Sequence, residues 1–466
     1  MNEIADSARR KQLADVLREH PAVADAVVTE GPDGTGHARI VPDPVGAGVL
    51  HRSAALAAAG RLGAALGWHE PAAEMRVAGL NRSETEFLHR EIFTDNAYFR
   101  HGITLPAGAV VVDVGANIGM FTLCVARRSP GARIIAVEPV AELADALALN
   151  AELHEVDATV LRTALGRTRG ETEFTFYPNN SVMSGRFADT TEDLEVLKGY
   201  LLTGENAQRG EHLDRLAADR MTARTRHVPV TTLTAVVHEH GLARIDLLKI
   251  DVEKAEAEVL DGIDDDLWPR IDRIVMEVHD VDGRLTTVLA ELRGRGFDVA
   301  REQDARLALT PCHNVYARRP AAGTAPAPLT APAGGPTLRR LEEELRDLVA
   351  RRLPSATAPG RYTLAADLGH TDDHGPGKER NVSDSPRTAV LARIWSELFG
   401  PQAVRLDADF FDLGGDSLTA VRLMATLENE LGEDALTPDL IFTDSTFGAL
   451  AAAVEASGDP ERTART

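Results

Sequence analysis

The sequence predicts an α/β protein built around a doubly wound, parallel β-sheet that helices cover on both faces. From about residue 75 to 318, short apolar runs alternate with helical stretches. These runs are continuously apolar, as expected of parallel strands buried on both faces. The first of them leads through a glycine-rich turn, "DVGANIG", into a helical stretch. This strand–turn–helix unit is typical of ligand-binding α/β sheets.

The composition sets limits on the class of protein. At 466 residues the chain has room for two to four domains. Its formal charge of −22 argues against a nucleic-acid or anionic-membrane partner. Two cysteines far apart in sequence, Cys124 and Cys312, indicate a reducing compartment. No apolar run approaches a membrane span and the N-terminus lacks a secretory signal, so we expect a cytoplasmic location.

The elements follow in order along the chain. A turn-rich stretch, 29–48, precedes an alanine-rich helix predicted over 51–66. The apolar runs that predict strands are 109–115, 132–139, 157–165, 244–253 and 273–280. Residues 320–336 are rich in Pro, Ala and Gly and predict a semi-extended linker. Beyond it, 338–352 predicts a charged helix, and helices alternate with short loops over 386–455.

The glycine-rich turn predicts a cofactor site. Gly115 and Gly119 let the backbone approach a ligand closely, although many such glycines serve only strand–helix packing. Asp113 ends the strand before the turn, and Glu138 ends the next strand, where a carboxylate can accept both hydroxyls of a ribose. The pyrophosphate-binding pattern is missing, and Asp113 would repel a phosphate. A cationic nucleoside, S-adenosylmethionine, fits better, and its expected site residues are Asp113, Gly115, Asn117, Gly119 and Glu138.

Residues 80–320 resemble the FkbM-type family of class I methyltransferases. The resemblance rests on "VVDVGANIGMFT", "IAVEP", "IDLLKIDVEKAEAEVLDGI" and "IVMEVHD". It implies a Rossmann-like fold and methyl transfer from S-adenosylmethionine, commonly to oxygen. Many members have glycine at the position of Lys254, which puts details of the substrate in doubt.

Methyl transfer needs an aligned acceptor and sometimes a base. The expected catalytic residues are His279 as general base and Asp251, both at strand ends. His279 could instead only hydrogen-bond a loop. Asp251, Glu277 and His279 could also bind a divalent metal, but their spacing alone gives this alternative little support. Glu253 and Lys254 could form a surface ion pair.

The stretch "FTFYPNNSVMSGRF" (174–187) mixes aromatic, amide and hydroxyl side chains. It predicts either a loop that covers the substrate or the polar turn of a hairpin. In the first case Tyr177, Asn180, Ser181 and Met183 would contact the methyl acceptor. Tyr98 and His101 could also reach the site.

The stretch "DADFFDLGGDSLTAVRLMATL" resembles the carrier domains of peptide and polyketide assembly lines, over 386–455. The resemblance implies a four-helix bundle in which Ser417 carries 4′-phosphopantetheine, added by a phosphopantetheinyl transferase. The helix that begins near Ser417 offers its positive end to a phosphate. The alternative, a serine that merely caps a helix, is common in other contexts.

Two further segments resemble parts of the small C-terminal subdomain of adenylation enzymes: 1–50, and 337–381 with Lys378 at the adenylation-lysine position. The methyltransferase, 74–319, would then be an insertion into this α+β subdomain. The core that binds ATP is absent from the chain, so the resemblance implies other synthetase domains or a separate adenylation core as partners.

Together these features predict methylation of an acyl or aminoacyl thioester on the carrier domain. The family resemblance favours oxygen as the acceptor, and the insertion in an adenylation subdomain favours the α-amine. A carrier and docking module with an inactive methyltransferase is the alternative from another class. The sequence leaves the tethered group, the natural product and the oligomeric state open.

Overall fold

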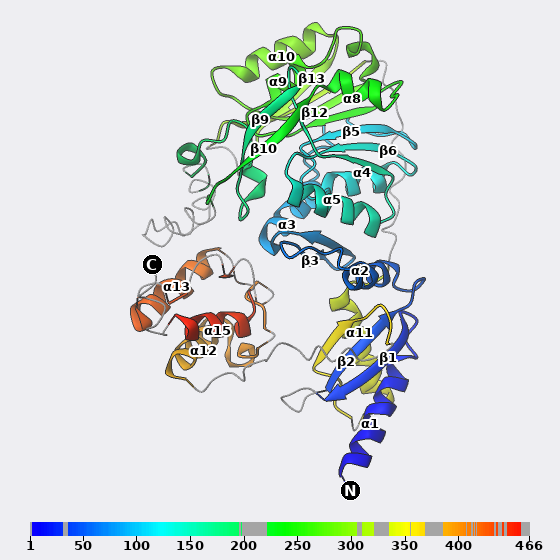
Figure 1. Cartoon of the computed structure of the whole chain (residues 1–466), viewed down its shortest axis with the longest axis vertical. Helices are drawn as coiled ribbons and strands as arrows, with labels where there is room; N and C mark the ends of the chain where they lie inside the picture. Colours follow the sequence, from blue (N-terminus) through cyan, green and yellow to red (C-terminus); the bar gives the residue numbers. More distant parts are fainter. Residues whose placement is uncertain are drawn as a thin grey trace.

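A computed structural model describes residues 2–30, 36–194, 197, 221–304, 310–320, 335–354, 356–368 and 385–457, apart from 407, 412, 414, 416, 433–434, 437–439 and 442–444 in the last segment. Figure 1 shows three bodies: a small unit in blue and yellow, a large α/β domain in cyan and green, and a helical bundle in orange and red. In the described residues no helix is long and apolar enough to cross a membrane. Lys378 and most of the predicted linker lie outside them.

The small unit is formed by two chain segments, one before and one after the α/β domain in the sequence. It holds α1 (Asn2–Leu17), β1 (Val23–Glu30), β2 (Gly36–Pro42), α11 (Leu338–Arg352) and β15 (Arg361–Leu364). The sheet order is β1-β2-β15, with β15 parallel to β2. One apolar core joins Leu17 and Ile40 to Leu341 and Val349. Residues 1–50 and 337–368 therefore fold together. The predicted turn-rich stretch 29–48 was wrong in part, because it contains β2.

The connection to the α/β domain differs from the predicted helix over 51–66. Helix α2 (Gly48–Ala58) begins earlier and ends before Gly60, whose φ of +66° is incompatible with a continuing helix. A two-stranded sheet, β3 (Gly67–Ala72) and β4 (Met75–Gly79), follows. It leads into α3 (Arg82–His89) and the π-helical turn η1 (Arg90–Thr94).

The large sheet has the order β13-β14-β12-β11-β5-β6-β7. The strands span β5 (Val110–Val114), β6 (Arg133–Val137), β7 (Ala158–Leu161), β11 (Leu247–Ile250), β12 (Arg273–His279), β13 (Asp298–Glu302) and β14 (Cys312–Arg318). Five strands are parallel, whereas β14 runs antiparallel to both β12 and β13. The doubly wound fold class is confirmed, with a mixed edge in place of a wholly parallel sheet.

Both faces of this sheet are buried. The helices are α4 (Met120–Arg128), α5 (Ala141–Leu153), α8 (Leu233–Glu239), α9 (Glu256–Asp261) and α10 (Arg284–Gly294), with a 3₁₀ turn, η3 (Trp268–Arg270). Val111 packs in one apolar cluster with residues of α4 and α5, while Val112 packs in the other with residues of α8 and α10. Successive strand residues point to opposite faces, so burial of both faces requires the continuous apolar runs seen in the sequence.

A smaller sheet stands beside the carboxyl ends of these strands. It contains β8 (Ala164–Leu165), β9 (Gly170–Phe176) and β10 (Arg224–Thr231), in the order β8-β10-β9. The strand predicted over 157–165 is thus two strands, β7 and β8, which belong to different sheets. The polar stretch after β9 forms a 3₁₀ turn, η2 (Ser181–Met183).

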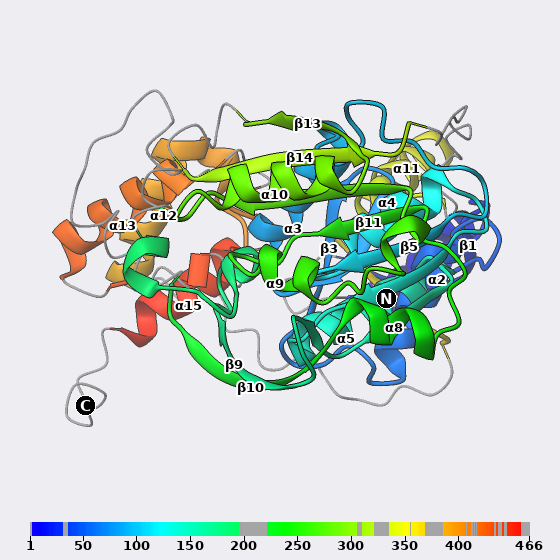
Figure 2. The same ribbon diagram turned by 90° about the horizontal axis from the view of Figure 1, so that it is seen from above.

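The C-terminal bundle packs α12 (Pro386–Phe399), α13 (Ser417–Leu431) and α15 (Phe447–Ala456) around Trp395, with the 3₁₀ turn η5 (Pro401–Ala403) beside it. Phe410 and Phe447 contact the Trp395 ring, at centroid distances of 5.8 and 5.4 Å. Figure 2 shows this bundle on the α3 side of the large sheet.

Candidate functional site

A cavity of about 450 Å³ opens where the strand order of the large sheet reverses, between β5 and β11. Open α/β sheets bind ligands at this point, outside the carboxyl ends of the strands. The volume suits a small cofactor together with part of a substrate. Of the predicted site residues, the lining includes Gly115, Asn117, Glu138, Asn180, Ser181, Met183, Asp251 and His279. The fold therefore brings most of the predicted residues together.

The glycine turn forms one end of the cavity. Gly115 has φ +76°, and a Cβ there would lie 1.7 Å from the carbonyl oxygen of Asp251. Only glycine permits this close approach of the backbone segments that follow the paired strands β5 and β11. The backbone N–H of Asn117 donates to Glu138 Oε2 at 2.9 Å, and the N–H of Val140 donates to Oε1 at 2.9 Å. Each carboxylate oxygen keeps a second lone pair for a ligand.

Glu138 is 4% exposed. Burial raises the pKa of Glu138 to about 7, although the amides of Val140 and Asn117 oppose the shift. A nearby cation and two hydroxyl donors would restore its charge. The site therefore favours a ligand that carries both.

Two of the predicted cofactor residues do not line the cavity. Asp113 is fully buried: its Oδ2 accepts from the Thr122 hydroxyl at 2.8 Å, and its Oδ1 lies 3.3 Å from Lys249 Nζ. Gly119 packs against Leu147, with a φ of +87° at the start of α4. We expected Asp113 to face the ligand. Instead it holds Lys249, which donates to the Gly115 carbonyl at 2.7 Å and fixes the turn.

An acidic floor of the cavity consists of Asp251, Glu253, Glu277 and His279. The backbone of Asp251 abuts Gly115 of the glycine turn. Asp251 Oδ2 accepts from the Tyr98 hydroxyl at 2.9 Å and lies 3.3 Å from Lys249 Nζ. Burial raises the pKa of Glu277 well above its usual range, and the charge of Asp251 adds to this. Burial also raises the pKa of Glu253, although His279 opposes it. Both carboxyl groups therefore keep their protons to a higher pH than they would in water.

His279 lies between Glu253 of this floor and Glu256 behind it. Its Nδ1 is 2.7 Å from Glu256 Oε1 and its Nε2 is 3.0 Å from Glu253 Oε2. Burial alone would lower the pKa of His279, but the surrounding carboxylates outweigh it and raise the pKa well above the usual value. Because an imidazolium has no free lone pair, the raised pKa disfavours His279 as the general base expected from the sequence. Glu256, held also by Arg284 at 2.8 Å, fixes the ring.

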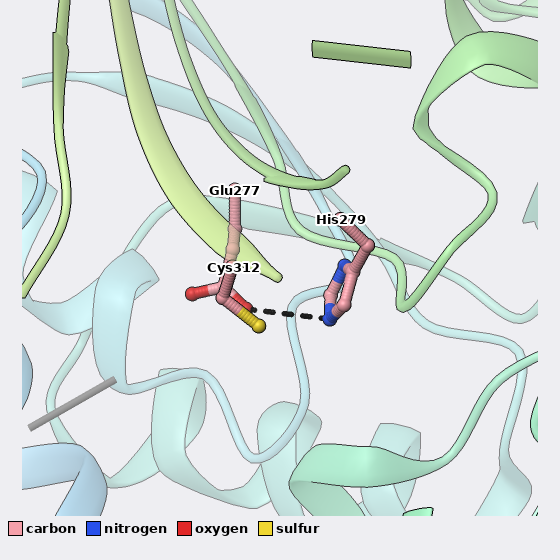
Figure 3. Close-up of side chains that lie close together, drawn as sticks. All are labelled: Glu277, His279 and Cys312. Atoms are coloured by element: carbon pink, nitrogen blue, oxygen red, sulfur yellow. Dashed lines mark ion pairs between the residues drawn. The ribbon is translucent and has the colours of Figure 1, made fainter. Parts of the chain in front are cut away.

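Figure 3 shows Glu277, His279 and Cys312 at the junction of β12 and β14. Their ligand atoms lie within 4.8 Å of one another, as do those of Asp251, Glu253 and Glu277. A divalent metal could take either set. In the structure, however, His279 Nε2 faces Glu253 at 3.0 Å and Glu277 at 3.9 Å, which is the geometry of an ion-paired imidazolium.

The turn η2 lies over the cavity. Ser181 N–H donates to Glu84 Oε2 at 3.0 Å, the Ser181 hydroxyl contacts the same carboxylate, and Asn117 Nδ2 donates to Ser181 Oγ at 3.0 Å. Asn180 and Met183 also line the cavity. Tyr177 does not: it is buried in a separate cluster with Leu197 and Met221 and donates to Asp193 at 3.0 Å. The prediction that Tyr177 contacts the substrate was therefore wrong.

Several residues of the site were not among those selected from the sequence. Lys249 sits inside an apolar strand and Glu84 belongs to a capping pattern with Asn81. Glu253 and Lys254 do not pair: Lys254 binds Asp193 at 2.9 Å and Glu192 at 3.2 Å. Lys254 also has φ +66°, a backbone conformation that glycine adopts without strain.

The bundle closes one side of the cavity. Phe411 and Gly415 of the bundle are lining residues. A Cβ at Gly415 would lie 2.4 Å from the Phe410 ring, so glycine is required for this loop to pack on its own core. Helix α13 begins two residues later, at Ser417. Because consecutive Cα atoms are 3.8 Å apart, the Cα of Ser417 lies within about 8 Å of that of Gly415.

Comparisons with known proteins agree with this arrangement. Residues 113–299 match the family model of the methyltransferase FkbM domain, and residues 389–454 match that of the phosphopantetheine attachment site. The chain is 46% identical over 246 residues to the 31-O-demethyl-FK506 methyltransferase FkbM of Streptomyces tacrolimicus, which covers 53% of this chain and 94% of that protein.

A second relative matches nearly the whole chain. The AMB antimetabolite synthetase AmbE of Pseudomonas aeruginosa is 34% identical over 486 residues, which covers 96% of this chain. The chain spans only 22% of the length of that synthetase. Among solved structures, the methyltransferase FkbM from Methylobacillus flagellatus aligns at 13% identity and a TM-score of 0.29, over 47% of this chain and 46% of that one.

Proposed function

Since the chain belongs to the FkbM family of S-adenosylmethionine-dependent methyltransferases and carries a phosphopantetheine attachment domain, we propose a reaction that uses both. In this proposal the enzyme methylates an oxygen of a thioester held on its own carrier domain. The methylation serves natural-product biosynthesis in a synthetase of the nonribosomal type. Ser417 is the proposed attachment residue for the 4′-phosphopantetheine arm.

The observation that carries the proposal is the composition of a single cavity. Its lining includes Gly115, Asn117 and Glu138 of the expected cofactor site, Asp251 and Glu253 of the acidic floor, and Phe411 and Gly415 of the carrier domain. A cofactor, an acceptor and a carrier can therefore meet in one place. A tethered substrate that starts within about 8 Å of Gly415 has an effective concentration on the order of millimolar.

The residues present fit S-adenosylmethionine. Glu138 offers a free lone pair on each oxygen to the ribose hydroxyls, and the positive φ of Gly115 lets the backbone pass close to the ligand. The acidic floor favours a cation, and the bound cofactor supplies an electrophilic methyl on a positive sulfur. Asp251, pinned by Tyr98 and Lys249, is the proposed neighbour of that charge.

Oxygen is favoured as the acceptor by the relative with 46% identity, whose name describes an O-methyltransferase. The α-amine of a carrier-bound amino acid is the second candidate. It is favoured by the insertion of the methyltransferase between two segments that share the sheet β1-β2-β15, which we propose to be an adenylation-type subdomain. We further propose that this subdomain serves an adenylation core outside the chain, and that a phosphopantetheinyl transferase loads the carrier.

Loading the carrier with matched substrates tests the acceptor. We expect a hydroxyacyl thioester to gain one methyl group on oxygen and the corresponding aminoacyl thioester to react poorly near neutral pH, because a protonated α-amine has no lone pair to attack the methyl carbon. Tandem mass spectrometry of the released acids locates the methyl group. Exclusive N-methylation of the aminoacyl thioester would contradict the proposed acceptor.

Substitution of Glu138 tests the cofactor pose. Glu138→Ala removes the acceptor of two ribose hydroxyls, so we expect about a tenfold to hundredfold weaker S-adenosylmethionine affinity. In the native protein the ionised form binds, so affinity should fall as the pH decreases through about 7, the pKa of Glu138. Calorimetry at about one pH unit below and about one pH unit above that pKa measures both effects. Glu138→Gln is the matched control: it keeps the shape and should lose the pH dependence.

A further inference from the structure

We propose that Arg82 is the docking residue for the carrier domain, and that its ion pair with Asp409 holds the carrier with the start of α13 over the cavity. This inference rests on the proposed function, since docking matters only if the carrier delivers the substrate. Nη1 of Arg82 lies 2.7 Å from Asp409 Oδ1, and the two side chains are 20% and 17% exposed. The pair is therefore shielded from solvent more than ordinary surface pairs.

The methyltransferase side of the contact is built into the wall of the cavity. Arg82 begins α3, and Glu84 and Phe87 of the same helix are lining residues. Nε of Arg82 pairs with Glu86 Oε1 at 2.7 Å, one helical turn along, so the guanidinium is held in one orientation. The guanidinium that contacts the carrier domain thus belongs to α3, the helix that also forms part of the cavity wall.

The carrier side is equally ordered. Asp409 Oδ1 accepts from the Phe411 N–H at 2.9 Å, and Oδ2 accepts from the Ser445 hydroxyl at 2.5 Å. Phe411 and Gly415 line the cavity, and α13 follows at Ser417. Asp409, Phe411 and Gly415 therefore all face the methyltransferase, and the proposed attachment residue follows two positions after Gly415.

The charges of the two partners are complementary at this point. Residues 386–455 contain 12 acidic and 4 basic side chains, so the carrier is strongly acidic. The rest of the chain is acidic as well, given the formal charge of −22. Two acidic bodies repel one another at long range, so a fixed cation at the contact selects one orientation of the carrier.

A double-mutant cycle in the full chain, Arg82→Ala with Asp409→Asn, tests the docking role. Asparagine keeps an acceptor for the Phe411 N–H, so the carrier loop is preserved. We expect each single variant to methylate the carrier-bound substrate about tenfold more slowly, and the double variant to be no slower than either. Methylation of a soluble pantetheine thioester should stay unchanged in all three.

Arg61→Ala is the matched control, because Arg61 forms an exposed ion pair with Glu152 at 3.0 Å in the methyltransferase half of the chain. It should leave both rates unchanged. Unchanged carrier-bound turnover in Arg82→Ala, additive losses in the cycle, or an equal loss with the soluble thioester would each overturn the docking role. Failure of the wild-type chain to methylate any carrier-bound substrate would instead count against the proposed function.

A measurement that needs no turnover accompanies the cycle. Cysteines placed at Arg82 and Asp409 should be joined by a short bismaleimide, because the two native side chains lie 2.7 Å apart. The native Cys124 and Cys312 are buried and react slowly, so they add little background. A pair at Arg61 and Asp409 should not be joined. Equal cross-linking of the two pairs would overturn the proposal even if the enzyme proved inactive.

Discussion

Ser417→Ala is expected to abolish both attachment of phosphopantetheine and methylation of the carrier-bound substrate. Ser417 is the first residue of α13, and the positive end of a 15-residue helix favours the phosphodiester that the modified serine carries. Without the arm no thioester forms, so the methyltransferase cavity receives no tethered acceptor. Intact-protein mass spectrometry after treatment with a phosphopantetheinyl transferase and coenzyme A measures the first effect.

Ser396→Ala in α12 is the matched control for this experiment, since it makes the same chemical change in the same bundle. It should still be loaded and methylated. The Ser417→Ala chain should keep its activity toward a soluble pantetheine thioester, which shows that the methyltransferase is intact. If the Ser417→Ala chain gained the mass of phosphopantetheine, the arm would be attached elsewhere and our assignment of the serine would be wrong.

The central sheet could be predicted because its strands leave a strong signal. Val111 and Val112 pack on opposite faces, so a strand buried on both sides must be apolar at every position. The order of the strands and the antiparallel β14 carry no such signal. The pairing of β2 with β15, more than 300 residues apart in the chain, was not predicted, because the resemblance indicated only that the two segments belong to one subdomain.

The site was predicted at the positions where local geometry demands a residue type. Gly115 is required because the backbone of Asp251 passes too close for a Cβ, and Glu138 directly follows the neighbouring strand β6. Lys249 could not be selected, because a lysine within "LLKID" looks like a solvent-facing residue of a strand. Its burial depends on Asp113 and Asp251, and only the folded sheet brings the three side chains together.

Tyr177 shows the opposite error. It lies in a stretch of aromatic and polar residues next to Asn180 and Ser181, which do line the cavity. The chain turns between Tyr177 and η2 (Ser181–Met183), and the Tyr177 ring packs in the cluster with Leu197 and Met221 instead. Proximity in sequence is a poor guide to which side of a turn a side chain takes.

Glu253→Gln is expected to lower kcat for a hydroxyl acceptor by about a hundredfold or more, with little change in KM. In the proposed reaction the acceptor oxygen bonds to the methyl carbon as the carbon–sulfur bond breaks, and the hydroxyl proton passes to Glu253. Burial raises the pKa of Glu253, which makes its carboxylate a stronger base than one in water. His279, 3.0 Å from Glu253, opposes this rise of the pKa. Single-turnover rates on the loaded carrier measure the effect.

The pH profile separates this role from a structural one. In the wild-type enzyme kcat should rise with pH as Glu253 loses its proton, and in Glu253→Gln that rise should be absent for a hydroxyl acceptor. An amine acceptor needs only to lose its ammonium proton, which water can remove at high pH, so an N-methyltransferase carrying Glu253→Gln would recover there. Glu192→Gln, an exposed partner of Lys254, is the control and should keep the wild-type profile. An unchanged kcat in Glu253→Gln would contradict the role of Glu253 as the base and would move that role to Asp251 or Glu277 of the same floor.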